Sequence, residues 1–132
     1  MRVPIEPAPI VRPKFRMWPR PDGIVQIVWM PTVMIGVADA TEAIDALNGL
    51  TGGRPTPLLV DARDARTQDR RARREFVRRI ELVSAIAMLV ATPLSRMMGN
   101  FFIGVSRPMV QTRLFEGEAA AVAWLSTFVD MP

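Results

Sequence analysis

Apolar positions in the second half of the chain follow two periods in turn, and this alternation predicts strands that each lead into a helix. Uninterrupted apolar runs, typical of buried strands, occupy residues 85–90 and 109–115. After each run, apolar residues recur every three or four positions, as they do on one face of a helix. Uninterrupted strands that alternate with one-faced helices indicate a mostly parallel sheet covered by helices. The helical positions are Leu94, Met97, Met98, Phe101, Phe102 and Val105 after the first run, and Val122, Leu125 and Val129 after the second.

Similar units precede these two. Residues 57–61 are a further buried strand, and Thr67 can cap a helix that runs to about Ile80. Asp39 and Glu42 have the spacing of a capping box at the start of another helix, which Gly52-Gly53 ends. Residues 32–38 fit either an extended or an irregular segment. The inner faces of the two helices are Ala72, Phe76 and Ile80, and Ala40, Ala43, Ile44, Leu47 and Leu50.

The N-terminal part of the chain predicts a β-hairpin. Residues 14–20 and 24–30 alternate with period two around Pro21-Asp22-Gly23, where proline presets the bend and glycine supplies a positive φ. We therefore expect an α/β fold with a mixed, mostly parallel sheet of about five strands, an N-terminal hairpin and about four helices. Residues 14–132 form one domain, and four prolines among residues 1–13 predict an extended arm.

Composition narrows the chemistry that the chain can perform. Histidine, cysteine and tyrosine are all absent from the 132 residues. Histidine bases, cysteine nucleophiles, thiolate metal sites and disulfides are therefore excluded. We expect a protein that binds rather than catalyses, with no catalytic residue, no metal and no cofactor.

No segment of the chain predicts export or membrane insertion. The N-terminus lacks an apolar core of signal-peptide length before its prolines and charges. The longest uncharged run, residues 82–95, is too short to span a bilayer and contains Pro93. A soluble cytoplasmic protein without a membrane span is expected.

Positive charge is concentrated in residues 1–20 and 66–79, and the second segment holds seven arginines. Arg70, Arg74 and Arg78 form a row at helical spacing that could bind phosphates. However, Asp69 can pair with Arg73 and Glu75 with Arg79 four positions on, and no aromatic residues interleave to stack bases. We expect a solvated face or a subunit contact, and nucleic acid is not an expected partner.

The order of elements and the amino-acid sequences of three segments resemble those of the STAS-like fold, which anti-sigma-factor antagonist domains share with their lipid-transfer-like relatives. The resemblance covers about residues 24–128 and implies a regulatory or interaction module. The segments that carry it are Pro57-Leu58-Leu59-Val60-Asp61, Thr92-Pro93-Leu94-Ser95-Arg96-Met97-Met98-Gly99-Asn100-Phe101-Phe102, and Arg113-Leu114-Phe115 through Glu118, Ala121 and Trp124-Leu125.

One departure from the family pattern concerns the loop after the central strand. Antagonist domains usually present an Asp-Ser pair there, whose phosphorylated serine switches the binding of an anti-sigma kinase. Here residues 61–67 read Asp-Ala-Arg-Asp-Ala-Arg-Thr, and Thr67 is the only hydroxyl. Thr67 is therefore the one candidate phosphorylation site in this loop, and a helix cap is its more ordinary role.

A candidate ligand site lies at the start of the helix that Thr92-Pro93 opens, because the carboxyl ends of parallel strands and the amides of a helix start both favour anions. The alternative is a purely structural start, with Thr92 as cap and Arg96 paired with an acid. Asp61 and Asp64 could also serve as a hydrolase or metal pair, although a salt bridge with Arg63 or Arg66 is the simpler role. The candidate ligand residues are Asp61, Arg63, Thr92, Ser95, Arg96, Asn100 and Arg113.

Two functions follow from these observations. The first is a non-catalytic regulatory module that binds a protein partner and forms a homodimer through the arm and the hairpin, where Trp18 and Trp29 lie on opposite strands. The second is a carrier of a small ligand or lipid in the crevice after Pro93. The apolar stripe from Met97 to Phe102 could line a lipid pocket, or it could simply be core.

Overall fold

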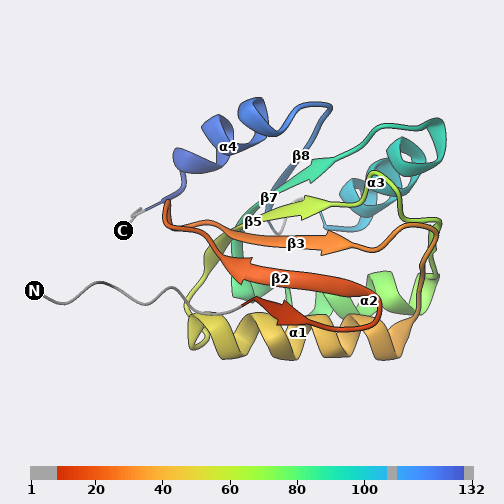
Figure 1. Ribbon diagram of the computed structural model, residues 1–132, viewed down its shortest axis with the longest axis horizontal. Coiled ribbons are helices and arrows are strands. Elements are labelled where there is room, and N and C mark those ends of the chain that lie inside the picture. The colour runs from red at the N-terminus through yellow and green to blue at the C-terminus, as the bar shows by residue number, and fades with distance from the viewer. Residues whose placement is uncertain (1–8, 107–109, 130–132) are drawn as a thin grey trace, which may run out of the picture.

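The computed structural model describes residues 9–106 and 110–129, and it is an α/β fold (Figure 1). Within these residues no helix is long and apolar enough to cross a membrane. The strands are β1 (Ile10–Val11), β2 (Phe15–Pro19), β3 (Val25–Trp29), β4 (Met34–Ile35), β5 (Thr56–Asp61), β6 (Thr67–Gln68), β7 (Val83–Leu89) and β8 (Gln111–Phe115). The helices are α1 (Val37–Thr51), α2 (Arg70–Arg78), α3 (Pro93–Ser106), α4 (Glu118–Ser126) and the short 3₁₀ helix η1 (Ile80–Leu82).

The main sheet has six strands in the order β1-β2-β3-β5-β7-β8. The first three strands pair antiparallel, and β3, β5, β7 and β8 pair parallel. This mixed, mainly parallel sheet with an N-terminal hairpin confirms the predicted fold class. The strand beyond the predicted five is β1, which lies within the segment predicted as an arm. Residues 1–8 of that arm lie outside the described residues, and the division into arm and domain stays a prediction.

The hairpin forms as its alternation predicts. Phe15 and Met17 on β2 point into the same core as Ile27 and Trp29 on β3, and all four side chains are buried. Gly23 in the turn has a φ of 87°, a conformation that glycine adopts without strain.

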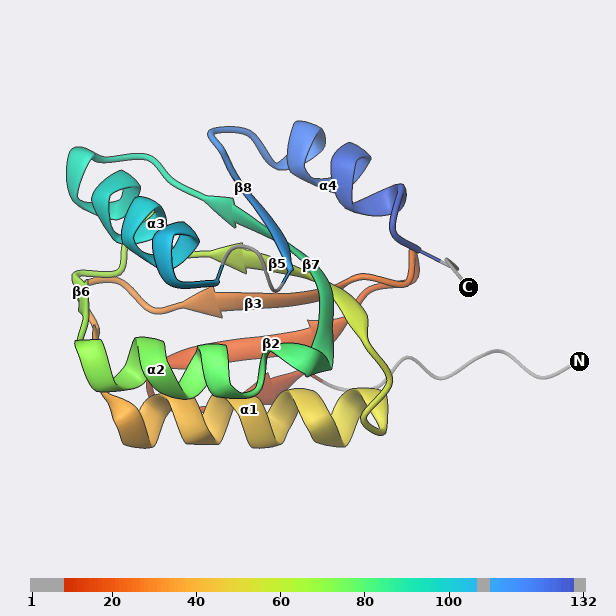
Figure 2. The same ribbon diagram turned by 180° about the vertical axis from the view of Figure 1, so that it is seen from behind.

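Helices cover both faces of the sheet, because both faces of its parallel part are apolar. The larger core lies between the sheet and α1, α2 and α3, and the smaller core lies between the sheet and α4. In both views α4 stands apart from the other three helices, and α1 and α2 lie side by side (Figures 1 and 2). The predicted inner residues of α1 and α2 face the larger core.

The starts of α1 and α2 differ from the prediction. Helix α1 begins three residues earlier than expected, with Gly36 as its N-cap, and the carboxylate of Asp39 accepts a hydrogen bond from the Gly36 amide (2.9 Å). The predicted cap of α2, Thr67, is wrong. Thr67 belongs to β6, which pairs with β4, and the cap is Asp69, whose carboxylate accepts from the Ala72 amide (2.7 Å).

The inward stripe of α3 is narrower than its apolar sequence predicts. Met98 and Phe102 are buried in the larger core, whereas Leu94 and Met97 are 40% and 49% exposed. Helix α3 approaches β8 so closely that a Cβ atom on Gly99 would lie 2.5 Å from Leu114 Cδ2. Helix α3 thus packs through the face that carries Met98, Gly99 and Phe102, and Leu94 and Met97 lie outside that face.

Candidate functional site

Most of the predicted ligand residues lie near the edge of the sheet where the parallel strands end. Asp61 is the last residue of β5, and Thr92, Ser95 and Arg96 follow β7. Helices α1, α2 and α3 all begin at this edge (Figure 1). We call it the carboxyl edge.

Thr92 and Ser95 form a reciprocal cap at the start of α3. The Ser95 hydroxyl accepts hydrogen bonds from the amides of Ala91 (2.9 Å) and Thr92 (3.0 Å). The Thr92 hydroxyl accepts in return from the Ser95 amide (3.0 Å). Ser95 is only 1% exposed, so its oxygen serves the backbone rather than the solvent. The structural role of this pair is therefore observed, and ligand binding by it stays a prediction.

The other residues around α3 and β8 do not converge on one point. Arg96 forms an ion pair with Glu116 (2.5 Å), and Asn100 is exposed one turn further along α3. The Arg113 guanidinium lies over the rings of Phe115 (5.3 Å to the centroid) and Trp124 (5.5 Å). Arg113 therefore lies on the α4 side of the sheet, and Arg96 lies on the opposite side with α3.

Asp61 and Arg63 form a close ion pair, as the sequence suggested. Asp61 Oδ2 accepts from Arg63 Nη2 (2.7 Å), and Oδ1 accepts from Nε (3.0 Å) and from the Arg63 amide (3.2 Å). The hydrogen bonds that Arg63 donates to Asp61 raise the pKa of Arg63 and outweigh the opposing effect of burial, with further support from the charges of Asp61, Glu118 and Asp64. Asp64 is exposed. The Asp61 carboxylate is thus engaged by a neighbouring cation.

The loop after β5 lacks a phosphorylatable residue next to Asp61. Ala62 occupies that position and is 3% exposed, with its methyl group in the larger core. Thr67 is half-buried in β6 opposite Met34. Phosphorylation of Thr67 stays a prediction.

The arginine row on α2 is exposed at Arg70, Arg74 and Arg78. The hydrogen bonds of Asp69 and Glu75 go to partners nearer than four positions, and the charge of Arg79 also acts on Glu75. Asp69 caps the helix, Glu75 pairs with Arg78, and Glu81 accepts from Arg79 Nε (2.9 Å). The hydrogen bond from Arg78 lowers the pKa of Glu75. Surface pairs of this kind stabilise little.

The sequence did not identify a group of exposed apolar side chains at the carboxyl edge. Among the described residues four large apolar side chains are exposed, and three of them lie here: Met34 (60%), Leu94 (40%) and Met97 (49%). Met34 belongs to β4, which pairs with β6, and α3 contacts β6 (Figure 2). We call these three residues the carboxyl-edge patch. The excess of apolar positions on α3, more than one helix face can bury, was the available signal.

Solved structures of other proteins share the fold of this chain. A structure of an anti-sigma factor antagonist from Mycobacterium paratuberculosis has a TM-score of 0.63 at 12% identity, over 88% of this chain and 98% of that chain. An uncharacterised protein of the DUF3478 family with a SpoIIAA-like fold, from Shewanella loihica PV-4, has a TM-score of 0.61 at 13% identity, over 84% and 91% of the two chains. The chain therefore has the SpoIIAA-like, or STAS-like, fold that its motifs suggested.

A family model identifies the family to which the chain belongs. Residues 17–129 match the model of a domain of unknown function, DUF7793, and the chain belongs to this family. A protein with unknown function from Arthrobacter sp. FB24 is 30% identical over 83% of this chain and 97% of that chain, with a TM-score of 0.33. A comparison with curated proteins finds no match.

Proposed function

We propose that the protein is a non-catalytic interaction module that binds a protein partner through the carboxyl-edge patch. The observation that carries the proposal is the exposure of Met34, Leu94 and Met97 at one edge of the sheet. Grouped apolar side chains on a surface mark binding sites, because a partner that covers them removes apolar area from water. Methionine side chains are flexible and polarizable, and they adapt to the shape of a partner.

The surroundings of the acidic side chains and the structural neighbours support binding over catalysis. Of the two neighbouring acids, Asp61 forms an ion pair with Arg63, and Asp64 is exposed to solvent. Among the described residues no group of three or more acidic side chains could hold a metal ion. The STAS-like neighbours include an anti-sigma factor antagonist, a class of protein that acts by binding.

We also propose that two copies associate through the N-terminal arm and the hairpin. The outer strand β1 is only two residues long, and Val11 on it is 62% exposed. An outer strand presents unpaired backbone groups, and the exposed Val11 side chain adds an apolar contact for a second copy. Association there leaves the carboxyl-edge patch free for a partner.

Site-specific photo-crosslinking in the native host tests the proposed partner site. A photoreactive phenylalanine derivative at Met97 should give a discrete adduct with another protein, and the same group at the exposed Ala123 on α4 should not. Adding Leu94→Glu should abolish the Met97 adduct in a chain whose circular dichroism spectrum is unchanged. Equal adducts from both positions, or an adduct insensitive to Leu94→Glu, would overturn the proposal.

A further inference from the structure

We propose that an interior cavity of this protein binds a small, mainly apolar carboxylic acid that carries a hydrogen-bond acceptor at the end remote from its carboxylate. The cavity lies between the sheet and helices α1, α2 and α3. None of Met34, Leu94 and Met97 lines it, so the inference is independent of the proposed partner site.

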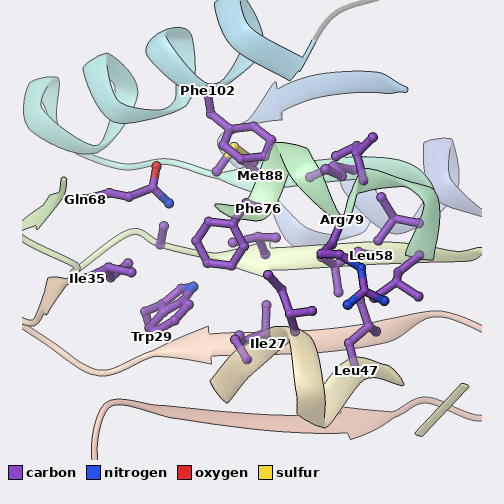
Figure 3. Close-up of a pocket in the computed structure, with 18 of the residues that line it drawn as sticks. Ile27, Trp29, Ile35, Leu47, Leu58, Gln68, Phe76, Arg79, Met88 and Phe102 are labelled. Carbon is purple, nitrogen blue, oxygen red and sulfur yellow. The ribbon is translucent and has the colours of Figure 1, made fainter. Parts of the chain in front are cut away.

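The size and the lining of the cavity determine the size and the polarity of the central part of the ligand. The volume of the cavity is about 80 Å³. One water needs roughly 10–15 Å³ on a comparable measure, so the space accommodates an object several times larger. The middle of the cavity is apolar and partly aromatic, with Phe76, Met88 and Phe102 around it (Figure 3). An empty apolar space of this kind costs stability, because the lining atoms lose packing contacts that a ligand would restore.

The indole N–H group of Trp29 opens into the cavity. Trp29 is 4% exposed, and its indole nitrogen points toward the middle of the cavity (Figure 3). Across residues 9–106 and 110–129 no atom accepts a hydrogen bond from it. Indole N–H groups in protein interiors ordinarily find an acceptor, and an oxygen atom of a ligand in the cavity would supply one here.

A second polar group lies near Trp29. The side-chain amide of Gln68 also lines the cavity, on the same side as Trp29 in Figure 3. In the described part of the chain this amide makes no hydrogen bond. Together the two groups form a polar end that suits a hydroxyl or carbonyl oxygen of a ligand.

The opposite side of the cavity carries a positive charge. Arg79 lies there beside Leu47 and Leu58 (Figure 3). Its Nε atom donates to Glu81 (2.9 Å), whereas its two terminal nitrogens make no hydrogen bond to any described residue. The Arg79 side chain is 33% exposed, so it spans from the cavity to solvent. A guanidinium in this position suits the carboxylate of a ligand whose apolar part lies deeper in the cavity, because the carboxylate then stays near water.

Three probes that share a hydroxyphenyl group and differ in their head group test this arrangement. The probes are 4-hydroxyphenylacetate, tyrosol and tyramine, which carry an acid, an alcohol and an amine on the same hydroxyphenyl group. Binding is followed by the indole N–H signals of the ¹⁵N-labelled full-length protein, which has three tryptophans. We expect the acid to bind most tightly and the amine most weakly, and we expect the Trp29 signal to shift more than those of Trp18 and Trp124.

Two variants and one matched control locate the site. Arg79→Gln should weaken binding of the acid about tenfold or more and remove the preference for it, because a charge-assisted hydrogen bond is lost. Arg78→Gln, at the exposed last residue of α2 next to Arg79, should leave binding unchanged. Ala43→Leu fills the cavity from α1 and should abolish binding of all three probes.

Several results would overturn the proposal. They are the absence of saturable shifts with every probe, equal affinity for the three head groups, a Trp29 signal that does not respond, and unchanged binding in Arg79→Gln. Should Ala43→Leu fail to fold, the comparison of Arg79→Gln with Arg78→Gln still decides the outcome, because both side chains reach the surface.

Discussion

At the scale of single residues, the hydrogen bonds around each side chain decide what its replacement costs. Ser95 and Ser84 both have buried hydroxyls. The Ser95 oxygen accepts from two backbone amides at the start of α3, whereas the Ser84 oxygen is without a partner among the described residues.

Removal of these two hydroxyls should therefore have opposite consequences. Ser95→Ala leaves two amides without their acceptor and should lower the free energy of unfolding by about 1–2 kcal/mol. Ser84→Ala removes an unpaired polar atom and should leave stability unchanged or raise it by up to about 1 kcal/mol. Urea unfolding at constant pH measures both. Equal losses in the two variants would contradict this account of the α3 cap.

The ion pair between Asp39 and Lys14 should make stability depend on acid pH. Burial raises the pKa of Asp39, but the hydrogen bonds from Lys14 (2.8 Å) and from the Gly36 amide, with the charge of Lys14, outweigh it and lower the pKa below its usual value. The charged form is thus favoured in the folded protein. Its stabilisation is complete above the usual aspartate pKa, roughly 3.9, and is lost as pH falls through the lowered value.

Asp39→Asn is the variant that tests this dependence. It should reduce the urea midpoint near neutral pH, and the difference from the natural sequence should shrink as pH falls toward about 2. Asp45→Asn, exposed on the same helix, serves as the control and should change little. A difference that stays constant across the pH range would contradict the assigned role.

Side-chain partners were predictable only where they lie close in sequence. The pair of Asp61 with Arg63, two positions apart, was expected and is observed. The partner of Arg96 is Glu116, twenty positions away, and its proximity depends on how α3 packs against β8. The cavity residues Trp29, Gln68 and Arg79 come from three separate elements, and no local spacing connects them.

At the scale of elements, the start of α2 shows where sequence patterns mislead. Thr67 and Asp69 are both good N-cap residues, and the sequence alone favoured the first. Pairing of Thr67 with Met34 in the two-stranded sheet removes it from the helix, so the cap moves to Asp69.

Substitution of the two residues distinguishes their roles. Asp69→Ala should lower the free energy of unfolding by about 1 kcal/mol, within a range of about 0.5–2, because the Ala72 amide loses its acceptor. Thr67→Ala should cost less, since no hydrogen bond of its side chain is present in the described structure. Chemical denaturation gives both values, and a larger loss in Thr67→Ala would restore the original prediction.

Element type was predictable because most elements bury a continuous face. Strand β7 is uninterrupted and apolar, and α1 repeats its apolar residues with helical spacing. Strands β4 and β6 have two residues each, which is too few to show a period, and they form only because the loops after β3 and β5 meet. The orientation of α3 was missed because Leu94 and Met97 continue its apolar pattern on a face that the sheet does not cover.

At the scale of the whole molecule, the two proposed contact regions occupy different parts of the sheet. The carboxyl-edge patch lies where the parallel strands end, and β1 forms the outer edge of the antiparallel part. This separation allows a homodimer to present two partner sites. Six sheet strands and the helices on both faces hold these regions in fixed positions.

Deletion of residues 1–13 should weaken the proposed homodimer, because it removes β1 with the rest of the arm. Val11→Lys is a milder variant that leaves β1 in place and puts a charge on the exposed position. Sedimentation equilibrium should show a higher dissociation constant for both variants. An unchanged constant in both would remove the arm and β1 from the interface.

Native mass spectrometry of the full-length protein, gently purified from its own cells, tests most directly whether this protein works by association. The account predicts a complex of two chains, with or without a partner protein, that separates into single chains on denaturation. A single chain at every concentration, free of any bound protein, would contradict it.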